Sequence, residues 1–294
     1  MRSLTQDGAV KVEARPRRRV IITADDYGRQ MLEDVRIERA SSDGVLSNVS
    51  VMANLVDHRR LRHLRSSVHG CSVGVHINLT EGQPVSQPKS IATLVDNDGM
   101  FYNFRTFLFR LITNQIRYSH LTIEIAAQIA IVEELYGAPS HIDSHKHVLQ
   151  FPRVLEAALQ CAVSSGIRRM RTTSRIFIDS EGAANTWICK AKHYAQTPLA
   201  LIARPLKTWA DWRMDHTGMT RPDGLISPVP PIALGAVEEN ARRWERVFFG
   251  LPHGTFEINV HPGYDDRDFH LLTSPSFKEA LVAAEVAIVS YSAL

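Results

Sequence analysis

Short apolar runs alternate with longer stretches of helical spacing along most of the chain. In residues 121–136, for example, apolar side chains recur three and four positions apart, which predicts an amphipathic helix. Strands that alternate with such helices predict βαβ units and a mostly parallel sheet. We therefore expect an α/β fold in which one domain covers residues 19–294 and follows a flexible leader at residues 1–18. The apolar runs that we interpret as strands include residues 20–24, 45–53, 72–79, 167–172 and 257–260.

Four apolar runs end in a polar turn that carries acidic or histidine side chains. The first turn contains the pair Asp25-Asp26, and the others contain His76, the histidine-rich residues 141–147, and His261. In parallel sheets, binding and catalytic groups collect at the carboxyl ends of the strands. We interpret the four turns as one active site that is assembled from several strand ends.

Residues 176–235 interrupt this alternation. The segment contains Trp187, Trp209 and Trp212, and its last part is rich in proline. We interpret it as a helical insert packed on the barrel. The alternative is a cap over the site, whose aromatic side chains stack on a sugar or touch a lipid tail.

Composition narrows the class of protein. The net charge of +3, from 34 basic and 31 acidic residues, is too balanced to indicate nucleic-acid binding. The three cysteines, Cys71, Cys161 and Cys189, are far apart and form no CxxC pair, which argues against a disulfide framework. No apolar stretch approaches the ~18 residues of a membrane-spanning helix. We expect a soluble, cytoplasmic protein with no membrane span and no nucleic-acid partner.

The residue types at the four turns suit a hydrolytic metal site. Such a site needs two or three protein ligands, an open position for water and a nearby base. Histidine and carboxylate ligands together suit zinc and other divalent first-row ions. Asp26, His76 and His145 form a candidate ligand set. Asp25 is free to act as the base, because successive side chains of an extended strand diverge, and His261 is the candidate acid or oxyanion partner.

Each of these side chains also has a purely structural interpretation. An Asp-Asp pair after a strand is often a turn or a helix cap, and His76 could be a buried core histidine. His261 could cap a turn, and residues 141–147 could form a surface histidine patch. The groups that we expect to orient the metal ligands are His141, Asp143 and His147.

Taken together, the turns resemble those of the YdjC-like family of carbohydrate deacetylases. The family includes chitooligosaccharide deacetylases and deacetylases associated with hopanoid biosynthesis. The resemblance extends over about residues 19–292. The motifs that carry it are Thr-Ala-Asp25-Asp26-Tyr-Gly, Gly-Val-His76-Ile-Asn-Leu-Thr-Glu-Gly, Pro-Ser-His141-Ile-Asp-Ser-His145-Lys-His147 and Val-His261-Pro-Gly.

The resemblance implies a fold, a reaction and a set of residue roles. The fold is a distorted (β/α) barrel, here a single domain with a helical insert. The reaction is removal of an N-acetyl group from an amino sugar or glycoconjugate, by attack of water activated by one divalent ion, zinc or magnesium. Asp25 would be the general base and His261 the general acid. Arg171 and Tyr27 would support the site or contact the substrate. The implied metal ligands are Asp26, His76 and His145.

Other functions remain open on the sequence. A metal-dependent phosphoesterase, or a non-catalytic carbohydrate-binding protein on the same barrel, would need similar residues. A non-haem iron oxygenase also uses two histidines and one carboxylate, and His141 and Asp143 have the His-x-Asp spacing of that class. The alternation of strands and helices argues against it, since those enzymes usually have an antiparallel double sheet. A homo-oligomer also remains open.

Overall fold

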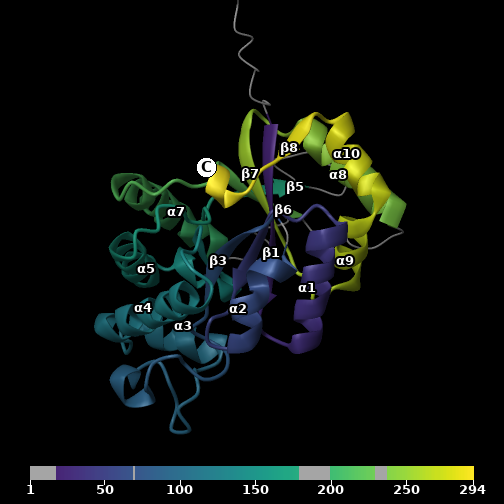
Figure 1. Ribbon diagram of the computed structural model, residues 1–294. Helices are drawn as coiled ribbons and strands as arrows, with labels where there is room; N and C mark the ends of the chain where they lie inside the picture. The colour runs from purple at the N-terminus through teal and green to yellow at the C-terminus, as the bar shows by residue number, and fades with distance from the viewer. Residues whose placement is uncertain (1–17, 69, 179–198, 229–236) are drawn as a thin grey trace, which may run out of the picture.

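The computed structural model describes residues 18–68, 70–178, 199–228 and 237–294. A curled parallel sheet lies at the centre, with helices on both flanks (Figure 1), so the predicted α/β fold is confirmed. The strands are β1 Arg18–Tyr27, β2 Asn48–Val51, β3 Ser72–Ile77, β4 Ile142–Ser144, β5 Arg175–Ile178, β6 Gly224–Pro228, β7 Gly254–Val260 and β8 Val286–Ile288. The α-helices are α1 Met31–Asp43, α2 His58–Ser67, α3 Phe104–Ile112, α4 Tyr118–Leu135, α5 Pro152–Ser164, α7 Leu199–His216, α8 Val237–Gly250, α9 Asp266–Thr273 and α10 Pro275–Ala283. Short 3-10 helices are η1 Pro88–Ile91, η2 His145–Gln150 and η3 Tyr291–Ala293.

β1 is the central strand. It pairs in parallel with β7 from Arg18, opposite Gly254, to Ala24, opposite Val260. On its other side, β8 pairs with its first half and β2 with its second half. Because β1 is buried on both faces, its apolar run is continuous and does not alternate with polar residues. The order β4-β3-β2-β1-β7-β6-β5, with all pairs parallel, brings the carboxyl ends of the strands to one edge.

A short segment extends the sheet beyond β4 toward β6. Met170 bridges Ile142 of β4, and Arg169 bridges Thr220, both in parallel. The strand predicted at residues 167–172 is therefore present only as these isolated bridges. The bridges link the β4 edge of the sheet to the residues just before β6, which agrees with the distorted barrel that the resemblance implied.

The segment 176–235, predicted to be a helical insert, contributes to the sheet itself. It contains α7, but also β6 and most of β5, and β6 joins β5 to β7. The sequence did not reveal these strands, because runs of four or five residues are too short for a clear strand pattern. Residues 179–198 and 229–236, which include Trp187, lie outside the described residues. A capping role for this segment stays a prediction.

The N-terminal part of the chain is described from Arg18, which begins β1. Residues 1–17, nearly all of the predicted leader, lie outside the described residues. In the described part of the chain, no helix is both long and apolar enough to cross a membrane.

α1 begins directly after the polar turn of β1. Gly28 in this turn has a φ of 100°, and a Cβ there would lie 2.5 Å from the Cβ of Val56, so only glycine fits. The buried Asp34, in the first turn of α1, accepts a hydrogen bond from the backbone N–H of Gly28 at 2.6 Å. Burial raises the pKa of Asp34 to about 6, although this hydrogen bond and the nearby Arg60 oppose the rise.

In the wild-type protein, ionisation of Asp34 should lower the free energy of unfolding as pH rises from about 3.8 to about 6. We expect Asp34→Asn to remove this pH dependence. The unfolded wild-type chain loses the Asp34 proton near pH 3.8, whereas the folded protein keeps it up to about pH 6. The contribution of Asp34 to the free energy of unfolding therefore falls as pH rises through this window, by on the order of 2–3 kcal/mol. Urea unfolding at both ends of the window measures the effect. The control is Asp43→Asn, an exposed position on the same helix. An unchanged pH dependence in Asp34→Asn would contradict the prediction.

Candidate active site

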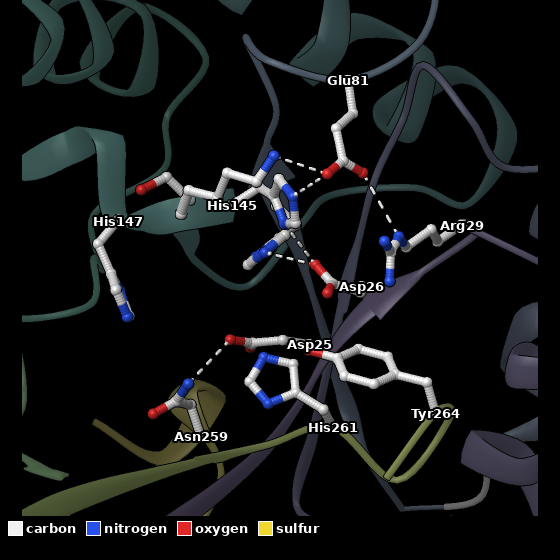
Figure 2. A pocket seen from close by; sticks show the side chains of 12 residues that line it. Asp25, Asp26, Arg29, Glu81, His145, His147, Asn259, His261 and Tyr264 are labelled. Carbon is white, nitrogen blue, oxygen red and sulfur yellow. Dashed lines mark hydrogen bonds and ion pairs between the residues drawn. The ribbon is translucent and has the colours of Figure 1, made fainter. Parts of the chain in front are cut away.

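The carboxyl ends of β1, β3, β4 and β7 surround a cavity of about 260 Å³ (Figure 2). Six of the residues proposed from the sequence line it, so four distant turns do meet as predicted. The lining residues are Asp25, Asp26, Arg29, His76, Glu81, Ser144, His145, Lys146, His147, Asn259, His261 and Tyr264.

The three predicted metal ligands lie together at one side of the cavity. Asp26 Oδ1 is 3.1 Å from His76 Nε2 and 2.8 Å from His145 Nδ1. One ligand atom from each residue lies within 4.8 Å of the others, and all three side chains are buried. Burial alone would raise the pKa of Asp26, but hydrogen bonds with His145 and His76 lower it overall. Asp26 is therefore a carboxylate in contact with two imidazoles, a donor set that suits a divalent ion.

The backbone at Asp26 sets the directions of the two aspartates. Asp26 has a φ of 65°, and the pairing of β1 with β2 shifts register between Ala24 and Tyr27. The sequence argument assumed an extended backbone at both aspartates, and this assumption was wrong for Asp26. The side chains nevertheless diverge: Asp26 faces the two histidines, whereas Asp25 faces Arg171.

Each of the two histidines has a second carboxylate at its other ring nitrogen. His76 Nδ1 is 2.8 Å from Asp143 Oδ1, so the predicted orienting role of Asp143 has a geometric basis. His145 Nε2 is 3.2 Å from Glu81 Oε1, within ion-pair range although the two are not aligned as a hydrogen bond. Burial alone would lower the pKa of His76, but Asp143 and Asp25 raise it well above its ordinary value.

Asp25 is held at the cavity by a buried arginine. Arg171 Nη1 and Nη2 donate to Asp25 Oδ2 and Oδ1 at 2.8 and 2.7 Å, and Asn259 Nδ2 donates to Oδ2 at 3.3 Å (Figure 2 shows the Asn259 contact). Arg171 Nη2 also lies 2.8 Å from both Asp143 Oδ2 and Glu257 Oε1. Burial alone would lower the pKa of Arg171, but the three carboxylates raise it well above its ordinary value. One guanidinium thus links the candidate base to the carboxylate behind His76.

Glu257 and Tyr291 form the buried floor below Arg171. Tyr291 donates its hydroxyl hydrogen to Glu257 Oε2 at 2.6 Å, and Thr23 donates to Oε1 at 2.8 Å. Burial raises the pKa of Glu257, and Arg171 partly offsets the rise. A continuous set of contacts therefore runs from Asp25 through Arg171 and Glu257 to Tyr291.

His141 lies in this floor and does not line the cavity. Its ring stacks on Tyr291 at 3.8 Å, and its Nδ1 is 2.8 Å from Ser140 Oγ. Burial lowers its pKa to about 3, so the ring is neutral. A Cβ on Gly74 would lie 2.3 Å from the ring, so glycine is needed there for the close approach. The structure thus gives His141 a packing position rather than a contact with the three candidate ligands.

The other predicted residues divide between cavity and core. His261 and His147 both line the cavity (Figure 2). The His261 backbone N–H donates to Asp268 Oδ2 at 2.8 Å, and its ring lies 5.2 Å from that of Tyr264. Tyr27, in contrast, is fully buried and donates to Glu38 Oε1 at 2.7 Å, so it lies away from the cavity.

Sequence reasoning assigned no role to several residues of the site. Glu257 and Asn259 precede His261 by four and two positions on β7, so strand alternation places all three on one face. This spacing of two residues could have predicted that Glu257 and Asn259 lie on the same face as His261. Glu81 belongs to the motif that follows His76, but its contacts with His145 and Lys146 come from a loop whose path no local pattern determines.

Comparison with known proteins places this chain in a family. A family model described as YdjC-like protein matches residues 19–283. The carbohydrate deacetylase of Mus musculus is 28% identical over 258 residues, which cover 85% of this chain and 79% of that protein. The carbohydrate deacetylase of Danio rerio is 34% identical over 157 residues, 53% of this chain and only half, 50%, of that protein. A proposed cellobiose-phosphate cleavage protein from Enterococcus faecalis shares the fold, with a TM-score of 0.71 and 22% identity, covering 94% of this chain and 98% of that one. The chain therefore belongs to the YdjC-like family.

Proposed function

We propose that the protein is a metal-dependent hydrolase that removes an N-acetyl group from an amino sugar or glycoconjugate. The observation that carries the proposal is the buried Asp26, His76 and His145 cluster, which shares an open cavity with Asp25 and His261. The curated relatives named carbohydrate deacetylase support the same reaction class.

The donor set fits one divalent cation. Three ligands from histidine and carboxylate, with open positions toward a cavity, match catalytic zinc sites. His145 Nε2 is buried and forms no hydrogen bond with the described residues, although the Glu81 carboxylate lies 3.2 Å away, so this nitrogen can still take up a ligand. A second group, Asp25, His76 and Asp143, is also compact, but the Arg171 guanidinium already supplies the cation beside its two carboxylates. A bound cation would polarise the acetamide carbonyl and lower the pKa of its water.

The residues on the opposite side of the cavity supply the proton transfers. Two hydrogen bonds from Arg171 and one from Asn259 hold the Asp25 carboxylate, which accepts a proton from the attacking water. His261 donates a proton to the amine nitrogen as the C–N bond breaks. The products are acetate and a free amino sugar.

Tyr264 offers a surface for the sugar. The residue is 49% exposed and lines the cavity, and the Arg29 guanidinium lies 5.4 Å from the centre of its ring. A partly exposed aromatic ring at a polar cavity can pack against the apolar face of a pyranose while polar neighbours bond its hydroxyls. The geometry also accommodates a phosphate ester, so a metal-dependent phosphoesterase is the second candidate. A non-catalytic carbohydrate-binding protein is the third, although Asp25 and all three candidate ligands are present.

The test is acetate release from a panel of N-acetylated sugars. The panel contains a monosaccharide, chitobiose, a nucleotide-linked sugar and a lipid-linked sugar. We expect acetate from at least one of them, loss of that activity after chelation, and recovery after zinc or magnesium is restored. A protein that holds one metal per chain but releases no acetate from any sugar would refute the deacetylase proposal. Phosphate release from sugar phosphates would then favour the phosphoesterase.

A further inference from the structure

Glu81 lines the main cavity but takes no part in the proposed proton transfers. Its Oε1 lies 3.2 Å from His145 Nε2, and Asp26 Oδ1 lies 2.8 Å from the other nitrogen of that ring. His76 is placed in the same way, between Asp26 at 3.1 Å and Asp143 at 2.8 Å. Each candidate histidine ligand therefore has a carboxylate beside both of its ring nitrogens.

Glu81 also neutralises two cations at the same cavity. Lys146 Nζ donates to Glu81 Oε1 at 2.6 Å, and Arg29 Nε lies 3.4 Å from Oε2 (Figure 2). Both cations line the cavity beside the candidate ligands. Without a counter-charge they would repel a divalent cation, because charges a few ångströms apart interact strongly at a partly buried site. Loss of the Glu81 charge would therefore weaken cation binding twice, through His145 and through these two cations.

The backbone of Glu81 is held by two asparagines. Asn78 Oδ1 accepts from the Glu81 N–H at 3.1 Å, and Asn78 Nδ2 donates to the Glu81 carbonyl at 2.8 Å. Asn54 Nδ2 donates to the same carbonyl at 3.0 Å and to that of Gln83 at 2.8 Å. Asn78 Nδ2 also donates to Asn54 Oδ1 at 3.0 Å, which joins the two side chains. These bonds keep the Glu81 side chain within reach of His145.

A polar stripe on the buried face of α4 anchors the segment 78–93, which carries Glu81. The stripe consists of His120, Glu124 and Gln128, which are four positions apart and therefore share a helix face. Gln128 accepts from the N–H of residue 78 at 3.0 Å and donates to its carbonyl at 2.6 Å. His120 Nδ1 accepts from the backbone N–H of residue 93 at 3.1 Å. The stripe thus fixes the segment at both of its ends.

Glu124 anchors the middle of the same segment. It is fully buried, and its two carboxylate oxygens accept from the backbone N–H groups of Val85 and Ser86 at 3.0 and 2.9 Å. Gln128 Nε2 donates to the same carboxylate at 2.9 Å. Burying a carboxylate is costly unless it is hydrogen-bonded. Two of these three bonds tie Glu124 to the chain just after Glu81.

We propose that Glu81 sets the affinity of the site for its divalent cation, and that the polar stripe of α4 positions Glu81 beside His145. Carboxylates that contact ligand imidazoles typically change metal affinity about 10- to 100-fold. The inference rests on the proposed function, because it concerns the same metal centre. It assigns to Glu124, a residue outside the cavity, a part in metal binding.

A metal titration of Glu81→Gln tests the first part without any sugar. Competition with a chromophoric chelator, with zinc as the probe, measures the affinity of metal-free protein. We expect one zinc ion per chain in the wild type and binding about 10- to 100-fold weaker in Glu81→Gln. Glu134→Gln, an exposed position on α4, is the matched control and should bind as the wild type does.

The outcomes separate this inference from the proposed reaction. Acetate release with equal zinc affinity in wild type and Glu81→Gln would overturn the role of Glu81 alone. A fall in zinc affinity without acetate release from any sugar would support Glu81 and refute the deacetylase. Wild-type protein that binds no zinc would overturn both the role of Glu81 and the metal dependence of the reaction.

Glu124→Gln tests the positioning step. Both oxygens of Glu124 accept backbone N–H groups, so an amide there loses at least one anchor of the segment. We expect zinc binding to weaken about 2- to 10-fold in the wild-type background, but no further in the Glu81→Gln background, because the effect acts through Glu81. The same factor in both backgrounds, or no weakening at all, would overturn the positioning role. If a melting curve shows Glu124→Gln to be unfolded, Asn54→Ala at its half-buried position provides the same comparison.

Discussion

Replacing Asp25 with asparagine is expected to lower the rate of acetate release by about 10²- to 10⁴-fold, the usual contribution of a general base. Asparagine has nearly the same shape but cannot accept the proton of the attacking water. The three candidate ligands do not include Asp25, so the variant should still bind one metal ion per chain. Steady-state kinetics and metal analysis on the same preparation measure the two quantities.

The environment of Asp25 determines which controls are needed. Both carboxylate oxygens accept from Arg171, so the amide of an asparagine would direct N–H groups toward a guanidinium. Some loss of stability is therefore expected, and a melting curve must show that the variant is folded at the assay temperature. Asp98→Asn, in an exposed turn, is the matched control and should leave activity unchanged. Activity of Asp25→Asn near that of the wild type would show that Asp25 is not the base.

Replacing Arg171 with methionine is expected to lower the free energy of unfolding by about 3–5 kcal/mol, because it leaves buried carboxylates without their cation. Arg171 is 5% exposed, and its partners Asp25, Asp143 and Glu257 are equally inaccessible. A loss of this size is a large part of the stability of a typical domain, about 5–15 kcal/mol. Urea unfolding at neutral pH measures the change. Arg171→Lys should restore only part of it, since an ammonium cannot reproduce the paired bonds to Asp25.

A surface ion pair provides the comparison for Arg171. Arg213 contacts Glu156 with both side chains partly exposed, at 28% and 30%. Exposed pairs of this kind contribute about 0–1 kcal/mol, so Arg213→Met should cost far less than Arg171→Met. If the two substitutions lower the free energy of unfolding equally, the buried ion pairs of Arg171 contribute no more to stability than a surface pair.

The sequence predicted which residues meet at the site better than it predicted the hydrogen bonds and ion pairs between them. Asp26, His76 and His145 could be grouped because each follows an apolar run, and parallel strands bring such ends together. The bidentate pair of Asp25 with Arg171 could not be predicted from residue patterns alone, since 146 positions separate the two residues. Only the resemblance pointed to this arginine, and no residue pattern around Arg171 indicated which carboxylates it contacts.

The errors in the predicted fold have a related cause. α4 is long, and its buried positions recur every three or four residues, so the sequence predicted this helix well. β5 and β6 are short, and their position in the sheet depends on β7, a distant segment. Tyr27 was grouped with the site through the motif that it shares with the two aspartates. The left-handed backbone at Asp26 alters the local direction of the chain, and the Tyr27 hydroxyl bonds Glu38 on α1 instead.

The place of Tyr291 in the floor has a consequence for synthesis on the ribosome. β1 emerges long before its partners β7 and β8, which follow more than 200 residues later, and Tyr291 follows later still. Until then, a growing chain would present the apolar faces of β1 to solvent. Contacts so distant in sequence slow folding and expose intermediates to aggregation. Molecular chaperones that shield the nascent chain should therefore influence how much of this protein reaches its native state.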